Sequence, residues 1–89
     1  MTTELVLLGE EPSAAVVLRS TRHQPGLLVQ ADTLSAARRT AADLVRELER
    51  GDLEDARYSA HELAETLQDW VTAYERMMHA AGRDVPYAK

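Results

Sequence analysis

The feature that most constrains this fold is a run of apolar residues spaced three and four apart, broken once by the short segment Arg50-Gly51-Asp52. Before the break the run holds Leu34, Ala37, Ala41, Leu44 and Leu48, and after it Leu53, Ala56, Ala60, Leu63, Leu67, Trp70, Tyr74, Met77 and Ala81. This spacing places one apolar stripe on each of two helices, which we expect over about 33–50 and 53–81. A connection this short makes the helices antiparallel, as an αα-hairpin with its stripes facing each other.

The predicted helices carry amino-terminal signals and differ in length. Asp32 or Thr33 is placed to cap the first helix, and Asp52 to cap the second, because their side-chain oxygens can accept hydrogen bonds from the free amides of a first turn. The second helix has roughly 29 residues and the first roughly 18, so at about 1.5 Å per residue the second overhangs the first by about 15 Å.

The overhang is rich in large apolar side chains, namely Trp70, Val71, Tyr74, Met77 and Met78. Burying each of them stabilises by about 1.5–3 kcal/mol, so we expect them to cover a sheet or another chain. A second stripe, spaced by sevens, widens the apolar face of this helix and consists of Ala64, Val71 and Met78. The second helix should therefore have two apolar neighbours.

The first third of the chain has the pattern of short strands. Apolar segments flank the turn-forming Glu10-Glu11-Pro12-Ser13, and a further one follows Pro25-Gly26. We expect strands at about 4–9, 14–20 and 27–30, the first two joined as a hairpin. The predicted fold is thus α+β, three short antiparallel strands followed by the helical hairpin (β-β-β-α-α), in a single domain over residues 1–89.

Two of the predicted strands are apolar on both faces, since Leu5 to Leu8 and Leu27 to Val29 do not alternate with polar residues. A sheet with one face on helices and the other in water should alternate. With only two helices available, a second copy of the chain is the simplest cover for the second face. We therefore expect a homodimer, formed by sheet stacking or by helix pairing.

Charge and composition exclude several classes of function. Ten Lys and Arg against fifteen Asp and Glu give a net charge of −5, which opposes binding to nucleic acid and favours a basic protein surface. The chain has no cysteine, so it has neither disulfides nor a thiolate nucleophile. The opening Met-Thr-Thr-Glu lacks the pattern of a signal peptide, and no apolar run is long enough to span a membrane. We expect a cytoplasmic protein with no membrane contact.

Catalytic and metal sites find little support in the sequence. His61 and Glu65 stand four apart on one helical face, as in some metalloprotease helices, but a hydrolytic zinc site needs a third protein ligand and a base. A solvated helix face with an i to i+4 pair is the simpler explanation of these two residues. No serine carries a nucleophile signature. We expect no enzyme activity, no metal and no cofactor.

The second helix carries an acidic ridge beside its apolar stripes. Our candidate partner-binding residues are Asp55, Glu62, Glu65, Asp69, Val71 and Met78. Carboxylates spaced by sevens share one side of a helix and can dock a basic partner, although such a ridge is often only a solvated face. The expected function is a non-enzymatic, cytoplasmic protein-interaction module, with the immunity or antitoxin type as its specific form.

An alternative function rests on basic residues before and within the first helix, namely Arg19, Arg22, His23, Arg38 and Arg39. Together with the free amides of the helix amino terminus, they could bind an anion. The alternative is therefore a small-ligand or anion-binding regulator. Solvated arginines paired with nearby carboxylates are the simpler explanation of the same residues.

A segment in the first half of the chain resembles a family of small bacterial proteins known only as a domain of unknown function. The resemblance rests on Ala15-Val16-Val17-Leu18, Pro25-Gly26-Leu27-Leu28-Val29-Gln30 and Asp32-Thr33-Leu34-Ser35. Gln24 and Ala31 depart from that family's pattern, which has an aromatic residue and a glycine there. The resemblance implies a bacterial origin and no particular activity.

Overall fold

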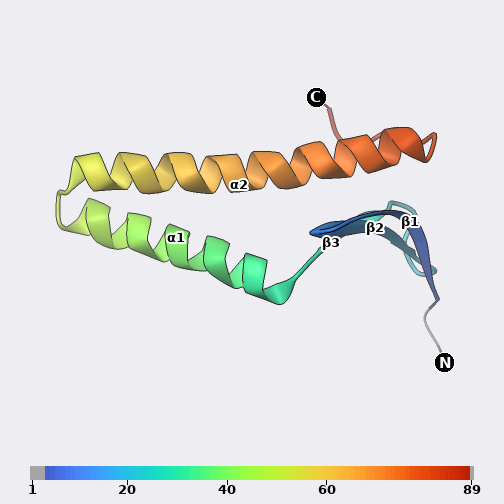
Figure 1. The fold of residues 1–89 in the computed structure, drawn as a ribbon, viewed down its shortest axis with the longest axis horizontal. Helices are drawn as coiled ribbons and strands as arrows, with labels where there is room; N and C mark the ends of the chain where they lie inside the picture. The colour runs from blue at the N-terminus through green and yellow to red at the C-terminus, as the bar shows by residue number, and fades with distance from the viewer. Residues whose placement is uncertain (1–3, 89) are drawn as a thin grey trace. The chain divides into compact units, whose positions relative to one another are not determined.

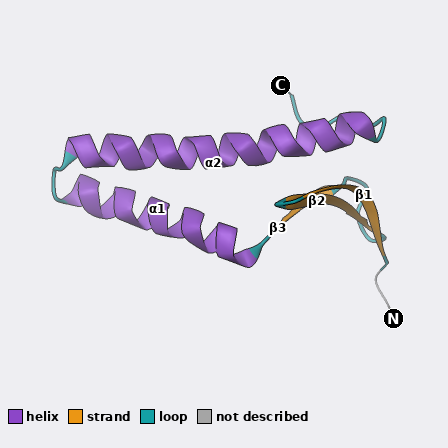
Figure 2. Cartoon of the chain, in the orientation of Figure 1, coloured by secondary structure: helices purple, strands orange, loops and turns teal. Residues whose placement is uncertain are grey.

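The computed structural model describes residues 4–88, in which three strands precede two helices (Figures 1 and 2). The elements are β1 (Leu5–Glu11), β2 (Ala14–Arg19), β3 (Gly26–Val29), α1 (Ala31–Glu49) and α2 (Leu53–Ala80). This order confirms the predicted β-β-β-α-α arrangement. The chain forms two compact units: residues 4–29 with 70–88, called here the sheet unit, and residues 30–69, called the hairpin unit. Because α2 is continuous, it contributes to both units.

The sheet is antiparallel in the order β1-β2-β3. β1 is longer than predicted: Glu11 still pairs with Ala14, so only Pro12 and Ser13 form the turn. The register shifts between Leu7 and Gly9, which leaves one extra residue on β1, as in a β-bulge.

The amino-terminal cap of α2 is the one predicted from the sequence, whereas that of α1 is not. Asp52 Oδ1 accepts a hydrogen bond from the Asp55 amide at 3.4 Å, as expected of a cap. The predicted cap of α1 at Asp32 or Thr33 is wrong, since α1 begins at Ala31 after Gln30, which makes no side-chain cap hydrogen bond. Instead, the Thr33 amide donates to Asp32 Oδ1 at 2.8 Å inside the first turn.

The connection between the helices depends on one glycine. Gly51 has a φ of 75°, a left-handed conformation that costs a side chain about 1–2 kcal/mol. The Gly51 amide donates to Leu48 O, and the Asp52 amide to Glu47 O, which closes the end of α1. The expected αα-hairpin is thereby formed.

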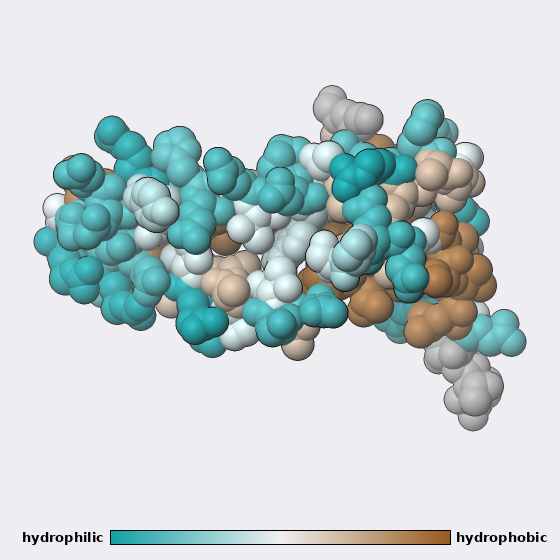
Figure 3. All heavy atoms as spheres, in the orientation of Figure 1, coloured by the Kyte–Doolittle hydropathy of each residue, from teal (hydrophilic) through white to brown (hydrophobic). Residues whose placement is uncertain are grey.

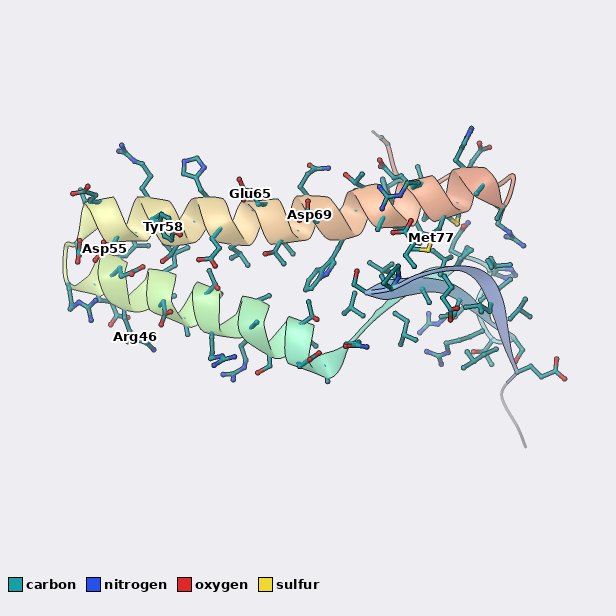
Figure 4. All side chains as sticks on the ribbon, viewed as in Figure 1. Arg46, Asp55, Tyr58, Glu65, Asp69 and Met77 are labelled. Carbon is teal, nitrogen blue, oxygen red and sulfur yellow. The ribbon has the colours of Figure 1, made fainter. Side chains whose placement is uncertain are left out.

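The core of the sheet unit lies between the strands and the end of α2. It contains Ala14, Val16, Ala73, Tyr74, Met77 and Met78, with Leu8, Leu27, Val29 and Val85 packed against it. Met77 points from α2 toward the strands (Figure 4). The buried Tyr74 hydroxyl donates to the Pro25 carbonyl at 2.8 Å. The apolar overhang therefore covers the sheet of its own chain, one of the two outcomes that the sequence allowed.

The seam of the hairpin unit is narrower than the sequence predicted. Its buried residues are small, namely Ala37, Ala56 and Ser59. The Ser59 hydroxyl donates to Glu47 Oε1 at 2.7 Å across the seam. Leucines expected inside the seam are instead about half exposed or more: Leu34, Leu48, Leu53 and Leu67. The apolar stripe of each helix is wider than the line of contact, so one edge of it packs and the other remains in solvent.

The sheet also exposes apolar side chains, as the unbroken apolar strands predicted. Leu5, Leu7 and Leu28 are each more than half exposed. Hydrophobic residues gather over the strands in the space-filling view (Figure 3). The chain alone thus leaves apolar surface uncovered on both of its units.

Candidate functional site

The acidic ridge lies on the part of α2 that belongs to the hairpin unit. Asp55, Glu62 and Asp69 follow one another at intervals of seven residues. A heptad brings a helix back to within about 20° of the same direction, so the three carboxylates share one side of α2. All three are exposed, as is Glu65 beside them, and Figure 4 shows Asp55, Glu65 and Asp69 projecting from this helix. The structure thus brings the predicted carboxylates together.

An aromatic residue that sequence reasoning missed stands within the ridge. Tyr58 follows Asp55 by three residues and precedes Glu62 by four, so it is their neighbour on the helix surface. Tyr58 is 73% exposed, and Figure 4 shows it on α2. The sequence could have indicated that this tyrosine is exposed, because Tyr58 is the one aromatic residue of the helix that lies outside both apolar stripes. Tyrosine is one of the residue types that are enriched where proteins bind one another.

Several carboxylates lie near one another at the amino-terminal end of the ridge. The pKa of Asp55 is raised above its ordinary value, first by its hydrogen bond with Asp52 and then by the negative charges of Asp52, Glu47 and Glu54. The carboxylates at the start of α2 therefore repel one another. A cationic group brought to this place would relieve their repulsion.

The two apolar residues of the predicted binding surface, Val71 and Met78, differ in their exposure to solvent. Val71 is 41% exposed and remains accessible. Met78 was predicted to face a partner, and this is wrong: it is 1% exposed and belongs to the core of the sheet unit. The two residues are seven apart on one stripe, but only the later one lies under the strands. A partner can therefore reach Val71 and not Met78.

The residues of the alternative anion site belong to different units. Arg19, Arg22 and His23 are exposed residues of the sheet unit, at the end of β2 and in the segment that follows it. Arg38 and Arg39 are exposed residues of α1 in the hairpin unit. Arg38 Nη2 lies 3.5 Å from Ser35 Oγ, one turn earlier in the helix. Each group is thus a set of solvent-facing basic side chains on its own unit.

One hollow of about 240 Å³ lies near the carboxyl-terminal end of α2, lined by Glu75, His79, Arg83, Asp84, Val85 and Tyr87. Tyr87 packs on Tyr74, with ring centres 6.2 Å apart, and its hydroxyl donates to Glu75 Oε2 at 3.1 Å. The charges of the lining are mixed, and part of its polar surface is satisfied within the chain.

Metal-ligating residues do not gather anywhere in residues 4–88: no group of three or more His, Asp or Glu there could hold an ion. His61 and Glu65 are both exposed on α2. In the same part of the chain, neither helix has the length and hydropathy needed to cross a bilayer.

Comparison with known protein families gives a match over nearly the whole chain. Residues 1–87 match DUF6959, a family of unknown function. No curated protein and no solved structure matches the chain. The family covers nearly the whole chain, both helices included, whereas the sequence resemblance described above concerned the strands and the start of α1.

Proposed function

Because the chain belongs to the DUF6959 family, whose function is unknown, we propose a role for it from its own surface. The proposed role is a non-enzymatic protein-interaction module of a bacterial cytoplasm, of the immunity or antitoxin type. Its ridge on α2 (Asp55, Tyr58, Glu62, Glu65 and Asp69) binds a protein partner with a basic surface.

The observation that carries the proposal is the exposure of Tyr58 between Asp55 and Glu62. A tyrosine that is 73% exposed gains little in the free protein from its large apolar ring. Tyrosine and arginine are the residues most enriched where protein interfaces gain their affinity. In a basic partner, one type of side chain could contact both the tyrosine ring and the carboxylates.

The chemistry of such a contact is specific to arginine. A guanidinium can stack on the face of the Tyr58 ring, and it can also pair with a carboxylate through two parallel hydrogen bonds. The spacing of Asp55 and Glu62, one on each side of the tyrosine along the helix, allows both contacts at once. Electrostatic attraction to the ridge would also speed the encounter of the two proteins.

The experiment that tests this function is affinity capture from the native host with charge-reversed bait. We expect the unmodified chain to retain a basic protein. The variant Glu62→Lys with Asp69→Lys should lose that protein while its melting temperature stays nearly unchanged, because both side chains are exposed. Tyr58→Ala should weaken capture without any change in charge.

The matched control distinguishes an effect of the ridge from an effect of the net charge of the protein. Glu10→Lys with Asp84→Lys reverses two other exposed carboxylates, so both double variants change the net charge from −5 to −5 + 4 = −1. The control should still capture the partner. Capture that survives reversal of the ridge, or that is lost equally in the control, would overturn the proposed function.

A further inference from the structure

The first half of β1 is exposed on both faces of the sheet. Leu5, Val6 and Leu7 are each more than half exposed, although successive residues of a strand point to opposite faces. The second half of the strand is covered, since Leu8 packs against the core of the sheet unit and Gly9 lies against α2. The three exposed residues are called here the free segment.

The free segment also has an unpaired backbone edge. β1 lies at the end of the sheet order β1-β2-β3, so β2 pairs with one of its edges only. The Ser20 amide donates to the Glu4 carbonyl at 3.0 Å, which places the backbone groups of Glu4 on the side of β2. Because this direction alternates along an antiparallel strand, the amides and carbonyls of Leu5 and Leu7 point to the other side. No strand among residues 4–88 pairs with them there.

This edge has little that opposes pairing with another strand. Proteins usually protect such edges with lysine, proline, inward-pointing charge or a bulge. The free segment contains no charged residue and no proline. Its protection begins only after Leu7, where the register shifts before Gly9, as a bulge would do. Amides and carbonyls that alternate along a strand edge are satisfied by a further extended strand.

The same segment of a second copy fits this edge in an antiparallel arrangement centred on Val6. Leu5 then lies opposite Leu7 of the other copy. Each such pair exchanges two hydrogen bonds, because both residues direct their backbone groups outward. Val6 lies opposite its own counterpart at the two-fold axis. The contact uses the same residues on both copies, so it closes as a dimer and leaves no free segment on either chain.

The side chains of the two copies also match across this junction. Within one chain, Val6 pairs with Leu18 and Leu7 pairs with Val17. The joined sheet therefore has a row of Leu18, Val6, Val6 and Leu18 on one face. The rows beside it, on the opposite face, each consist of Val17, Leu7, Leu5 and Arg19. Apolar and β-branched neighbours of this kind stabilise antiparallel pairs.

The charges and the bulge of β1 disfavour the neighbouring registers. Leu5 opposite Leu5 would set the carboxylate of Glu4 against the apolar Val6. Leu7 opposite Leu7 would set Leu5 against Gly9, which lies past the register shift. In the arrangement centred on Val6, no two charged side chains of residues 4–11 lie opposite each other.

We propose that two copies of this chain pair edge to edge through the free segments of β1, which joins their sheets into one antiparallel sheet with three strands from each copy. A second copy is selected because one register pairs every outward amide and carbonyl of the free segment and opposes no charges. The pairing uses the sheet unit, so it does not rest on the ridge of α2. The dimer would carry two ridges, and two linked sites raise the overall affinity for a repeated or dimeric partner.

Sedimentation equilibrium of the full chain tests the pairing, at concentrations up to about 0.5 mM because the contact is short. The expected mass approaches twice the 9.9 kDa of one chain. Leu7→Lys should give the mass of one chain, since lysine at a strand edge opposes pairing. Leu28→Lys is the matched control and should leave the dimer intact. Leu28 lies on the same face of the sheet as Leu7 and is similarly exposed, 58% against 56%, but it belongs to β3.

A disulfide tests the register with a small change of side chain. The chain has no cysteine, so Val6→Cys introduces one thiol per copy. At the two-fold axis the two Cα atoms would lie about 4.5 Å apart, within the span of about 4.4–6.8 Å that a disulfide bridges. In a glutathione redox buffer, Val6→Cys should form a disulfide-linked dimer. Leu5→Cys should not, because its counterpart lies two residues further along the other strand.

Other occupants and other contacts give different results. An unmodified chain that stays monomeric at the highest concentration would overturn the proposal and leave this edge to a strand of another protein. A dimer that Leu28→Lys splits as readily as Leu7→Lys would mean that the sheets stack face to face. A dimer that survives Leu7→Lys, or one in which Leu5→Cys links at least as readily as Val6→Cys, would also contradict the pairing centred on Val6.

Discussion

Arg76 of α2 holds the carboxylate of Glu11 at the end of β1 through two hydrogen bonds, 2.8 Å from Nε to Oε2 and 2.7 Å from Nη2 to Oε1. The contact joins residues at opposite ends of the sequence within the sheet unit. The guanidinium holds the pKa of Glu11 below its ordinary value, chiefly through the hydrogen bonds, and the carboxylate raises the pKa of Arg76.

This pair predicts a specific dependence of stability on pH. Because the folded state binds the Glu11 proton less readily than the unfolded chain, its contribution is present above the ordinary pKa of 4.5 and is lost as the pH falls through the lowered value. Glu11→Gln should therefore be less stable than the unmodified chain at pH 7, and the difference should shrink below pH 4.5. Urea denaturation at several pH values measures this. A constant deficit of Glu11→Gln at all pH values would contradict the assignment.

Gly9 provides a test of the packing between β1 and α2. A Cβ at this position would lie 2.9 Å from the Cβ of Met77, too close for either backbone to keep its place. Gly9→Ala should destabilise the fold by about 1–3 kcal/mol, the usual cost of overpacking. At Gly26 an added Cβ would meet nothing within 4 Å, so Gly26→Ala should be neutral or stabilise by up to about 1 kcal/mol. Equal effects at the two glycines would show that β1 does not pack on Met77.

Met78 and Val71 distinguish core from surface on one helical stripe. Met78→Ala removes a side chain that is 1% exposed, and we expect a loss of about 2–5 kcal/mol in the free energy of unfolding. Val71→Ala, at a position that is 41% exposed, should cost less than about 1 kcal/mol. Denaturant titration of both variants measures the two values. Similar losses would mean that the sheet does not cover Met78.

The hairpin could be predicted because its signals are local and repeated. Three-and-four spacing over both helices and a connection that contains Gly51 leave few other arrangements. The start of α1 could not be located from the sequence, because the helix begins after Gln30 without a side-chain cap. Asp32 and Thr33 are residue types that often cap helices, and they lie two and three residues after Gln30, inside the first turn. Capping residues identify a helix end only when the backbone there uses them.

The role of each apolar stripe was harder to predict than its existence. Ala64, Val71 and Met78 share one direction on α2, yet only Met78 is buried, because only that part of the helix packs on the strands. Periodicity states which residues share a side and not which neighbour covers it. For the same reason, four of the leucines assigned to the hairpin seam are exposed, namely Leu34, Leu48, Leu53 and Leu67, while Ala37, Ala56 and Ser59 are buried in it. Tyr58 escaped notice because it belongs to no apolar pattern.

The most direct test of the proposed function is the association rate constant of the captured partner, measured by stopped flow at increasing ionic strength. If the ridge attracts a basic surface, the rate constant for the unmodified chain should fall steeply with added salt, since the Debye length shortens from about 10 Å at 0.1 M to about 3 Å at 1 M. The Glu62→Lys and Asp69→Lys double variant should associate slowly, and added salt should not slow it further. The same rate constant and the same salt dependence in both proteins would contradict the claim that this ridge recruits the partner.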